Sequence, residues 1–171
     1  DYGYASVVLF VGVGTALTIL VQSSSAAMAI TITMAFKGWI DMPVAAALVM
    51  GENIGTTITA YLASLQMNAN AKRSARAHMI FNLLGVAWML AIFFPFLGIV
   101  DWIAPGAADT AAHIPVHLAV FHSLFNVTNT LVLIWFVPRL SRVVRKMVPD
   151  EKQVSTGLPH DLPLVRGGGS E

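Results

Sequence analysis

The sequence predicts an all-α membrane protein with one re-entrant helical hairpin and about three transmembrane helices, one of them broken. Hydrophobic residues make up 56% of its 171 residues and charged residues only 11%, whereas a soluble domain usually carries about 25% charged residues. Short runs of serine, threonine, asparagine and glycine interrupt the apolar segments. Because irregular backbone at membrane depth must be buried in protein or line a wet cavity, these interruptions are candidate binding sites.

Composition also limits the partners and the location of the chain. A formal net charge of +1, without a basic patch interleaved with aromatic residues, argues against nucleic acid as a partner. The absence of cysteine excludes disulfides and thiolate metal sites. The sequence begins almost directly in apolar residues without the basic segment of a signal peptide, which suggests an artificial boundary at this point or the middle of a longer protein. We expect a multi-pass protein of the cell membrane, surrounded by lipid.

The first expected element is the hairpin, whose arms are residues 4–22 and 26–36. The second arm has about 11 residues, well short of the roughly 20 needed to span a bilayer. The two arms therefore predict a re-entrant hairpin whose tip is the run Gln22-Ser23-Ser24-Ser25. Gly12, Gly14, Thr15 and Thr18 give the first arm a small face suited to close helix packing.

Residues 42–65 form the next apolar segment and are long enough to cross a membrane. Asp41 at the cap position and Pro43 in the first turn predict where this helix starts. Glu52 is the only acid within a predicted membrane segment. Such residues are functional candidates by default, and the alternative for Glu52 is a structural cap beside a helix break.

The motif Gly-Glu-Asn-Ile-Gly-Thr-Thr, residues 51–57, lies in the middle of that segment. Two glycines four residues apart, in the company of Asn53, Thr56 and Thr57, predict an unwound stretch between two half-helices. Transporters use such breaks to direct helix ends and free carbonyls at a midplane site. The alternative is that the glycine pair serves ordinary helix packing.

Basic residues predict the orientation of the remaining segments. Residues 66–77 are expected to form a basic loop, 79–100 a span broken late by Pro95, 101–113 a loop without Lys or Arg, 114–137 a further span, and 138–146 a second basic segment. The positive-inside rule puts both basic segments in the cytoplasm and the N-terminus outside, so the hairpin enters from the outer side. Residues 1–148 are then one transport-domain repeat, and 149–171 a polar linker or expression tail.

Histidine appears in two repeated patterns. His78 and His122 both begin the pattern H-x-x-F-N, which puts His and Asn on one helix face. We expect these side chains to link helices by hydrogen bonds, with direct ligation of substrate or ion as the alternative. His113 and His117 have the spacing of a metal pair, but without a third ligand and with Pro115 between them we favour a surface or helix-start role.

At these motifs the chain resembles the sodium-phosphate cotransporter family, the type II proteins and their bacterial relatives. Gln22-Ser23-Ser24-Ser25-Ala26 resembles the family's QSSS signature, and residues 51–57 resemble its G-x-N-I-G-T-T motif. The two H-x-x-F-N segments are similar to its later helices. Members of this family carry two such repeats of inverted topology, and this chain resembles the second, with Glu52 where many relatives have Ser or Ala.

The resemblance implies sodium-coupled symport of inorganic phosphate, with sodium as the coupling ion and no enzyme activity. The expected phosphate ligands are Gln22, Ser23, Ser24, Ser25, Asn53 and Thr56. The expected sodium ligands are Gln22, Ser24, Asn53, Thr56 and Thr57. Half-helix N-termini following Ser25 and Gly55 would attract the anion, and carbonyls freed by unwinding would bind sodium. The missing first repeat, or a second copy of the chain, is the expected partner.

The sequence is also compatible with three other functions. The same site could carry another small oxyanion, or the chain could be a membrane scaffold that does not transport. A membrane hydrolase would need a His close to one of the serines, and the sequence has no G-x-S-x-G elbow.

Overall fold

The computed structural model describes residues 3–107 and 110–149, and this part of the chain is helical throughout without a strand. Its elements are α1 (Tyr4–Val21), α2 (Ser24–Phe36), α3 (Met42–Ser64), α4 (Ala69–Ala91), α5 (Phe93–Ile103), α6 (Ile114–Leu133), the 3-10 turn η1 (Ile134–Phe136) and α7 (Val137–Met147). The predicted all-α class is confirmed. The linker expected from residue 149 onward falls almost wholly outside the described residues.

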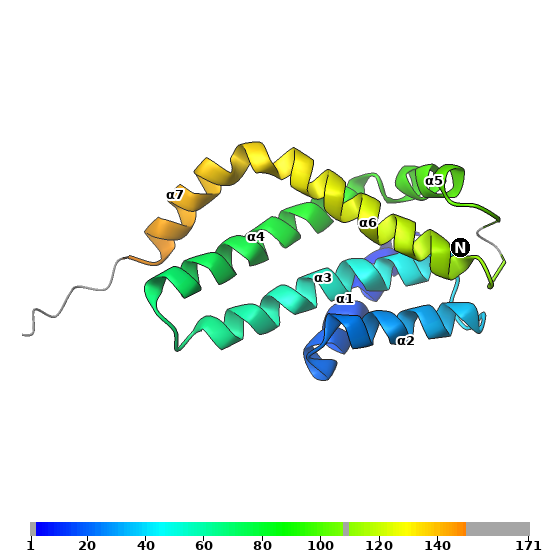
Figure 1. Ribbon diagram of the computed structural model, residues 1–171, viewed down its shortest axis with the longest axis horizontal. Helices are drawn as coiled ribbons and strands as arrows, with labels where there is room; N and C mark the ends of the chain where they lie inside the picture. Colours follow the sequence, from blue (N-terminus) through cyan, green and yellow to red (C-terminus); the bar gives the residue numbers. More distant parts are fainter. Residues whose placement is uncertain (1–2, 108–109, 150–171) are drawn as a thin grey trace, which may run out of the picture.

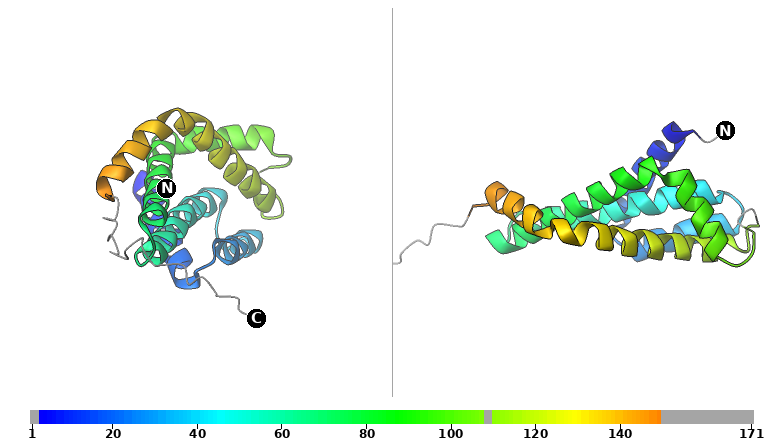
Figure 2. Two further views of the ribbon diagram at one scale, coloured as in Figure 1. Left: turned by 60° about the vertical axis from the view of Figure 1, so that its left-hand side comes forward. Right: turned by 90° about the horizontal axis from the view of Figure 1, so that it is seen from above.

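Helix α3 is the centre of the bundle. It packs against α1, α2, α4 and α6, and Figures 1 and 2 show α1 on one side of it and α6 on the other. Every residue from position 44 to position 52 is buried. A helix that is apolar all round is stable only inside other elements, so this segment of α3 takes the innermost place.

Side-chain caps fix where α3 and α4 start. Asp41 Oδ1 accepts a hydrogen bond from the Val44 N–H at 3.1 Å, and Pro43 lies in the first turn, which confirms the predicted start of α3. Asn68 Oδ1 accepts from the Ala71 N–H at 2.9 Å and starts α4 at Ala69. The prediction of a loop over residues 66–77 is therefore wrong, because an Asn cap followed by alanine and basic residues, all good helix formers, begins a helix there.

The predicted unwinding of residues 51–57 is also wrong, since α3 continues through them. The two glycines of the motif are contact points for α1. A Cβ atom on Gly51 would lie 2.7 Å from the Thr15 nitrogen, and one on Gly55 would lie 2.7 Å from the Thr18 Cβ atom. The alternative interpretation of the glycine pair, close helix packing, is the correct one.

The threonines of the same motif bond back to their own helix. The Thr56 hydroxyl donates to the Glu52 carbonyl at 2.8 Å, and the Thr57 hydroxyl donates to the Ile54 carbonyl at 2.7 Å. This local bonding satisfies the hydroxyls inside a helix. The carbonyls that were expected to be freed for sodium at positions 53–56 therefore belong to a continuous helix.

The broken element is the α4–α5 pair, which bends by 87° at Ile92. Pro95 follows three residues later, where its ring would clash with the Ala91 carbonyl in a continuous helix. The late break expected from Pro95 is thus confirmed. With this pair counted as one span, up to three segments in the described residues are long and apolar enough to cross a membrane; the other two are Tyr4–Val21 and Ile114–Met147.

Helices α1 and α2 are joined by a tight turn at Gln22 and Ser23. Gln22 has φ 55°, the left-handed conformation that commonly ends a helix. In Figure 1 this turn lies level with the middle of α3 rather than with either of its ends. Helix α2 has 13 residues, about 20 Å at 1.5 Å per residue, and is too short to cross a bilayer core of about 30 Å.

Candidate functional site

A cavity of about 230 Å³ lies where the N-terminus of α2 meets the middle of α3 and the face of α6. Its lining residues are Ser24, Ser25, Met28, Glu52, Asn53, Thr56 and His122. Helix α2 contributes two serines and a methionine, α3 contributes a glutamate, an asparagine and a threonine, and α6 contributes a histidine. None of the lining side chains is a lysine or an arginine.

The α2 wall of the cavity is a capped helix N-terminus. Ser23 Oγ accepts a hydrogen bond from the Ala26 N–H at 3.3 Å, and the Ser23 carbonyl accepts from the Ala27 N–H at 3.0 Å. Ser24 and Ser25 form the first turn and are exposed. The first backbone N–H groups of a helix have no partner within it and favour an anion, so this wall offers neutral donors and the positive end of a helix dipole.

The α3 wall carries a buried carboxylate. Glu52 is only 2% exposed, and its Oε1 accepts a hydrogen bond of 2.7 Å from the Thr31 hydroxyl of α2. Its other oxygen, Oε2, is buried and has no hydrogen-bond partner in the described part of the chain, and the same holds for Asn53 Nδ2. Buried polar atoms are nearly always paired, so these two atoms are candidates for contact with a bound ion.

The α6 wall is His122. The sequence predicted that the H-x-x-F-N segment starting at this residue links helices by hydrogen bonds. The Asn126 amide donates to the His122 backbone carbonyl at 2.8 Å, and the Asn82 amide donates to the His78 carbonyl at 3.2 Å. Both asparagines therefore bond within their own helices, and the prediction that they link helices is wrong. A different pair links α4 to α6, the Trp88 indole N–H donating to Asn129 Oδ1 at 3.0 Å.

The structure brings together four of the residues predicted to bind phosphate or sodium: Ser24, Ser25, Asn53 and Thr56. Gln22 and Ser23 lie at the exposed turn and do not line the cavity. Thr57 is fully buried and bonded to its own helix, so it also lies outside the lining.

Glu52 and His122 complete the cavity. Neither was among the expected phosphate or sodium ligands, although direct ligation was the alternative for His122 and Glu52 was a functional candidate. Each gave a signal in the sequence. Glu52 was the one acid in an apolar segment, and His122 began one of the repeated H-x-x-F-N patterns. What the sequence did not supply was their position beside the serine turn.

His113 and His117 lie apart from this cavity. His113 immediately precedes α6, in agreement with the predicted helix-start role. His117 is fully buried, so a surface role is wrong for it; its Nδ1 is 3.1 Å from the His113 carbonyl and its Nε2 is 3.6 Å from Asp101 Oδ1. Within the described residues no group of three or more His, Cys, Asp or Glu side chains could hold a metal ion.

Comparison with known proteins assigns the fold around this cavity to a family. Residues 5–100, from α1 into α5, match the family model described as Na+/Pi-cotransporter. This chain belongs to the Na+/Pi-cotransporter family. The match includes the α2 and α3 walls of the cavity, and His122 lies beyond its end.

Individual members of the family are similar over different lengths. The chain is 34% identical over 137 residues to the uncharacterized protein YqeW of Bacillus subtilis, covering 80% of this chain and 42% of that protein. It is 30% identical over 146 residues to the putative inorganic phosphate export protein YjbB of Escherichia coli K12, covering 85% of this chain and 26% of the relative. It is 42% identical over 94 residues to mouse sodium-dependent phosphate transport protein 2C, covering 52% of this chain and 16% of that protein. No solved structure matches the chain.

The chain therefore spans less than half the length of these Na+/Pi-cotransporter relatives. Their family is one of transporters, and the helices of this member include segments able to cross a membrane. Phosphate transport is the activity that the family suggests.

Proposed function

We propose that this chain is one half of a sodium-coupled phosphate transporter in the cell membrane, and that the cavity between α2, α3 and α6 is part of its ion pathway. The observation that carries the proposal is the exposed α2 N-terminus opening onto a cavity without a cationic side chain. Phosphate would be held there by Ser24, Ser25 and the free N–H groups of the first turn. Asn53 and Thr56 would bind it from α3.

A buried carboxylate in the same cavity requires a positive partner when an anion is bound. Two like charges a few ångströms apart repel strongly in a site of low dielectric. Sodium prefers oxygen ligands, and Glu52 Oε2 is a buried oxygen without a partner among the described residues. Sodium at Glu52, with oxygens of Ser24, Asn53 or Thr56, would offset the charge of phosphate and couple the binding of the two ions. Gln22 and Thr57, the other expected sodium ligands, are less suited because they lie outside the cavity.

The hairpin would be re-entrant and the chain would be one of two inverted repeats. The shortness of α2 and the position of its turn beside the middle of α3 support this arrangement. In transporters built from inverted repeats the second half covers such a polar tip. A first repeat elsewhere in the protein, or a second copy of the chain, would serve that purpose.

Each sodium ion that enters down a potential of 100 mV releases about 2.3 kcal/mol, so two or three ions can move a phosphate inward. The printed name of YjbB refers to export. The direction of transport in this protein would follow from the ion gradients and the number of sodium ions coupled.

The proposal is tested by binding of radiolabelled phosphate to the purified chain with sodium or with choline, followed by uptake into liposomes with and without a sodium gradient. We expect Ser24→Ala and Ser25→Ala to weaken phosphate binding about 10- to 150-fold, because a hydrogen bond to a charged group contributes about 1.5–3 kcal/mol. Thr33→Val is the matched control, since the Thr33 hydroxyl lies on the same helix but bonds the Ala29 carbonyl.

Normal binding by both serine variants would show that the cavity is not the phosphate site. Equal binding in sodium and in choline would overturn the coupling. An equal amount of sulfate displacing the phosphate would favour a carrier of another oxyanion.

A further inference from the structure

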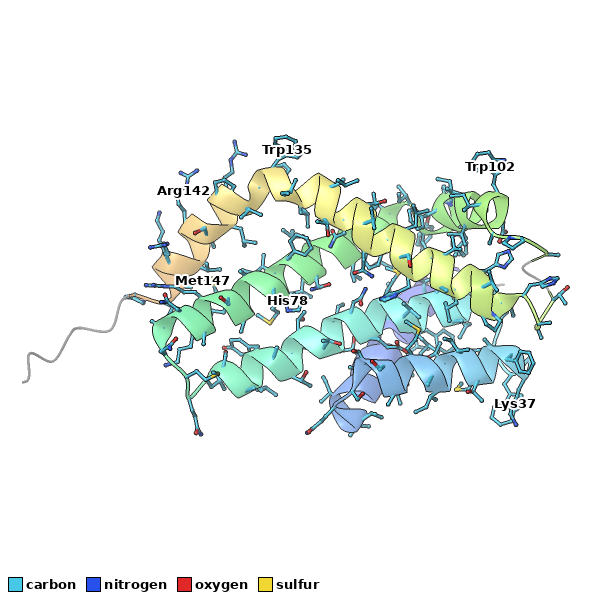
Figure 3. All side chains as sticks on the ribbon, viewed as in Figure 1. Lys37, His78, Trp102, Trp135, Arg142 and Met147 are labelled. Carbon is cyan, nitrogen blue, oxygen red and sulfur yellow. The ribbon has the colours of Figure 1, made fainter. Side chains whose placement is uncertain are left out.

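The two ends of the helical bundle differ sharply in charge. The described cations of α4 and α7 are Lys72, Arg73, Arg76, Arg139, Arg142, Arg145 and Lys146. Figure 3 shows Arg142 and Met147 at one end of the bundle, and Lys37 and Trp102 at the other. The three acids among the described residues are Asp41 at the start of α3, the central Glu52, and Asp101 in α5. The α7 end is therefore strongly cationic without a described acid to balance it.

Two of these arginines hold α7 against α4. Arg73 Nε donates to the Val148 carbonyl at 2.9 Å, and Arg76 Nη1 donates to the Met147 carbonyl at 2.8 Å. Cations at the C-terminus of a helix bind its free carbonyls and complement its dipole. These contacts fix the position of α7, whose own cations, Arg139, Arg142, Arg145 and Lys146, all remain exposed.

An apolar groove of about 520 Å³ leads to this cationic surface. It runs between α4, which contributes Ile80, Leu84 and Trp88, and the α6–η1–α7 segment, which contributes Leu133 and Phe136. Its one charged lining residue is Arg139, and Val143 also lines it.

A basic hollow of about 460 Å³ adjoins the groove. Its lining is Arg139, Arg142, Val143, Arg145 and Lys146. Arg139 and Val143 therefore belong to both spaces, and the groove and the hollow form one continuous surface with an apolar part and a cationic part.

We propose that this surface binds an anionic phospholipid, with an acyl chain in the groove and the headgroup phosphate at Arg139 and Arg142. Guanidinium groups bind phosphate oxygens in a bidentate manner, which makes arginine the suited residue. Trp135 is 79% exposed at the bend between α6 and α7. Exposed tryptophans are enriched at the membrane–water interface, where lipid headgroups lie. The cationic hollow and the apolar groove thus adjoin each other as the headgroup and the acyl chain of a lipid do.

The charge of the surface decides between occupants. A second copy of this chain docking by the same end would bring the basic residues of its α4 and α7 to an end that already lacks a described acid, and its α1, α2 and α6 contain no acid to balance them. An anionic lipid brings the charge that is missing, and basic clusters beside membrane helices attract anionic lipids for this reason. This inference does not rest on the proposed transport of phosphate.

The test is quenching of Trp88, which lines the groove, by lipids with brominated acyl chains. The protein for this test carries Trp39→Phe, Trp102→Phe and Trp135→Phe, so that all tryptophan fluorescence comes from Trp88. It is kept in a detergent without net charge. Brominated phosphatidylglycerol is compared with brominated phosphatidylcholine of the same chains. We expect half-maximal quenching at about a tenfold lower mole fraction of phosphatidylglycerol, as for an interaction that adds charge-assisted hydrogen bonds.

Arg139→Gln with Arg142→Gln should abolish most of that preference while circular dichroism stays unchanged, since both side chains are exposed. The matched control, Lys37→Gln with Lys72→Gln, removes the same charge from residues that line neither space and should keep the preference. Equal quenching by the two lipids in the unmodified protein would overturn the proposal. So would an equal loss in the control, which would indicate bulk attraction, or no quenching by either lipid, which would indicate a groove covered by protein.

Discussion

Alanine at Gly14 should destabilise the protein, whereas alanine two residues earlier at Gly12 should not. Both glycines lie within α1. A Cβ atom on Gly14 would lie 2.8 Å from the Leu48 carbonyl carbon and 2.9 Å from its Cα atom on α3, but one on Gly12 would meet nothing within 4 Å. Carbon atoms pack at about 3.5–4.0 Å, so α1 and α3 must move apart to admit the methyl group at Gly14.

The expected magnitude has three parts. Overpacking of a tight contact costs about 1–3 kcal/mol. Separation of the helices also weakens the contact of the Thr15 hydroxyl with the Gly51 carbonyl, 3.0 Å in the structure. The same hydroxyl donates to the Val11 carbonyl at 2.8 Å, so this loss costs at most about 1 kcal/mol. Replacing glycine by alanine inside a helix stabilises that helix by about 1 kcal/mol, which offsets part of this loss. The free energy of unfolding should therefore fall by about 1–3 kcal/mol for Gly14→Ala and rise by up to about 1 kcal/mol for Gly12→Ala.

Reversible unfolding in mixed micelles, followed by far-ultraviolet circular dichroism, measures both variants against the unmodified chain. Gly51→Ala, on the α3 side of the same contact, should behave like Gly14→Ala. Equal stability of the Gly12 and Gly14 variants would show that α1 and α3 do not approach as the structure has them. It would also return residues 51–57 to the predicted role of an unwound, adaptable segment.

Three further changes test single contacts, each by the same unfolding measurement. Asp41→Ala removes the cap of α3 and should cost about 0.5–2 kcal/mol, while Asp41→Asn should keep most of the stability; equal losses would exclude the cap. Thr31→Val removes the donor to Glu52 Oε1 and should cost about 1–3 kcal/mol, and saturating sodium should restore part of it if the carboxylate binds this ion; a loss unaffected by sodium would argue against Glu52 as its ligand. Trp88→Phe leaves Asn129 Oδ1 without its 3.0 Å donor and should cost about 1–3 kcal/mol, and unchanged stability would show that this bond does not hold α4 to α6.

Local signals in the sequence determined much of the fold. The arms of the hairpin, the start of α3 at Asp41 with Pro43, and the late break before Pro95 all follow from length, capping and the geometry of proline. Each depends on residues within one or two helical turns of the feature itself. Such features need no knowledge of what packs against them, and the structure agrees with all of them.

The course of α3 was decided by tertiary contact. Glycine four residues from glycine permits both an unwound stretch and the close approach of another helix, and the local sequence cannot separate the two. The backbone of α1 at Val11 and Thr15 occupies the space above Gly51. That contact keeps the segment helical, since unwinding would give up the packing of the whole interface.

The cavity was likewise only half determined by the sequence. Ser24, Ser25, Asn53 and Thr56 could be named from their motifs, because polar residues inside apolar segments are conspicuous. Glu52 and His122 could be noticed but not placed, because their position depends on how α3 and α6 rotate against α2. That rotation is fixed by buried contacts among helices distant in the sequence, such as the bond between Thr31 and Glu52, and only the packed bundle contains them.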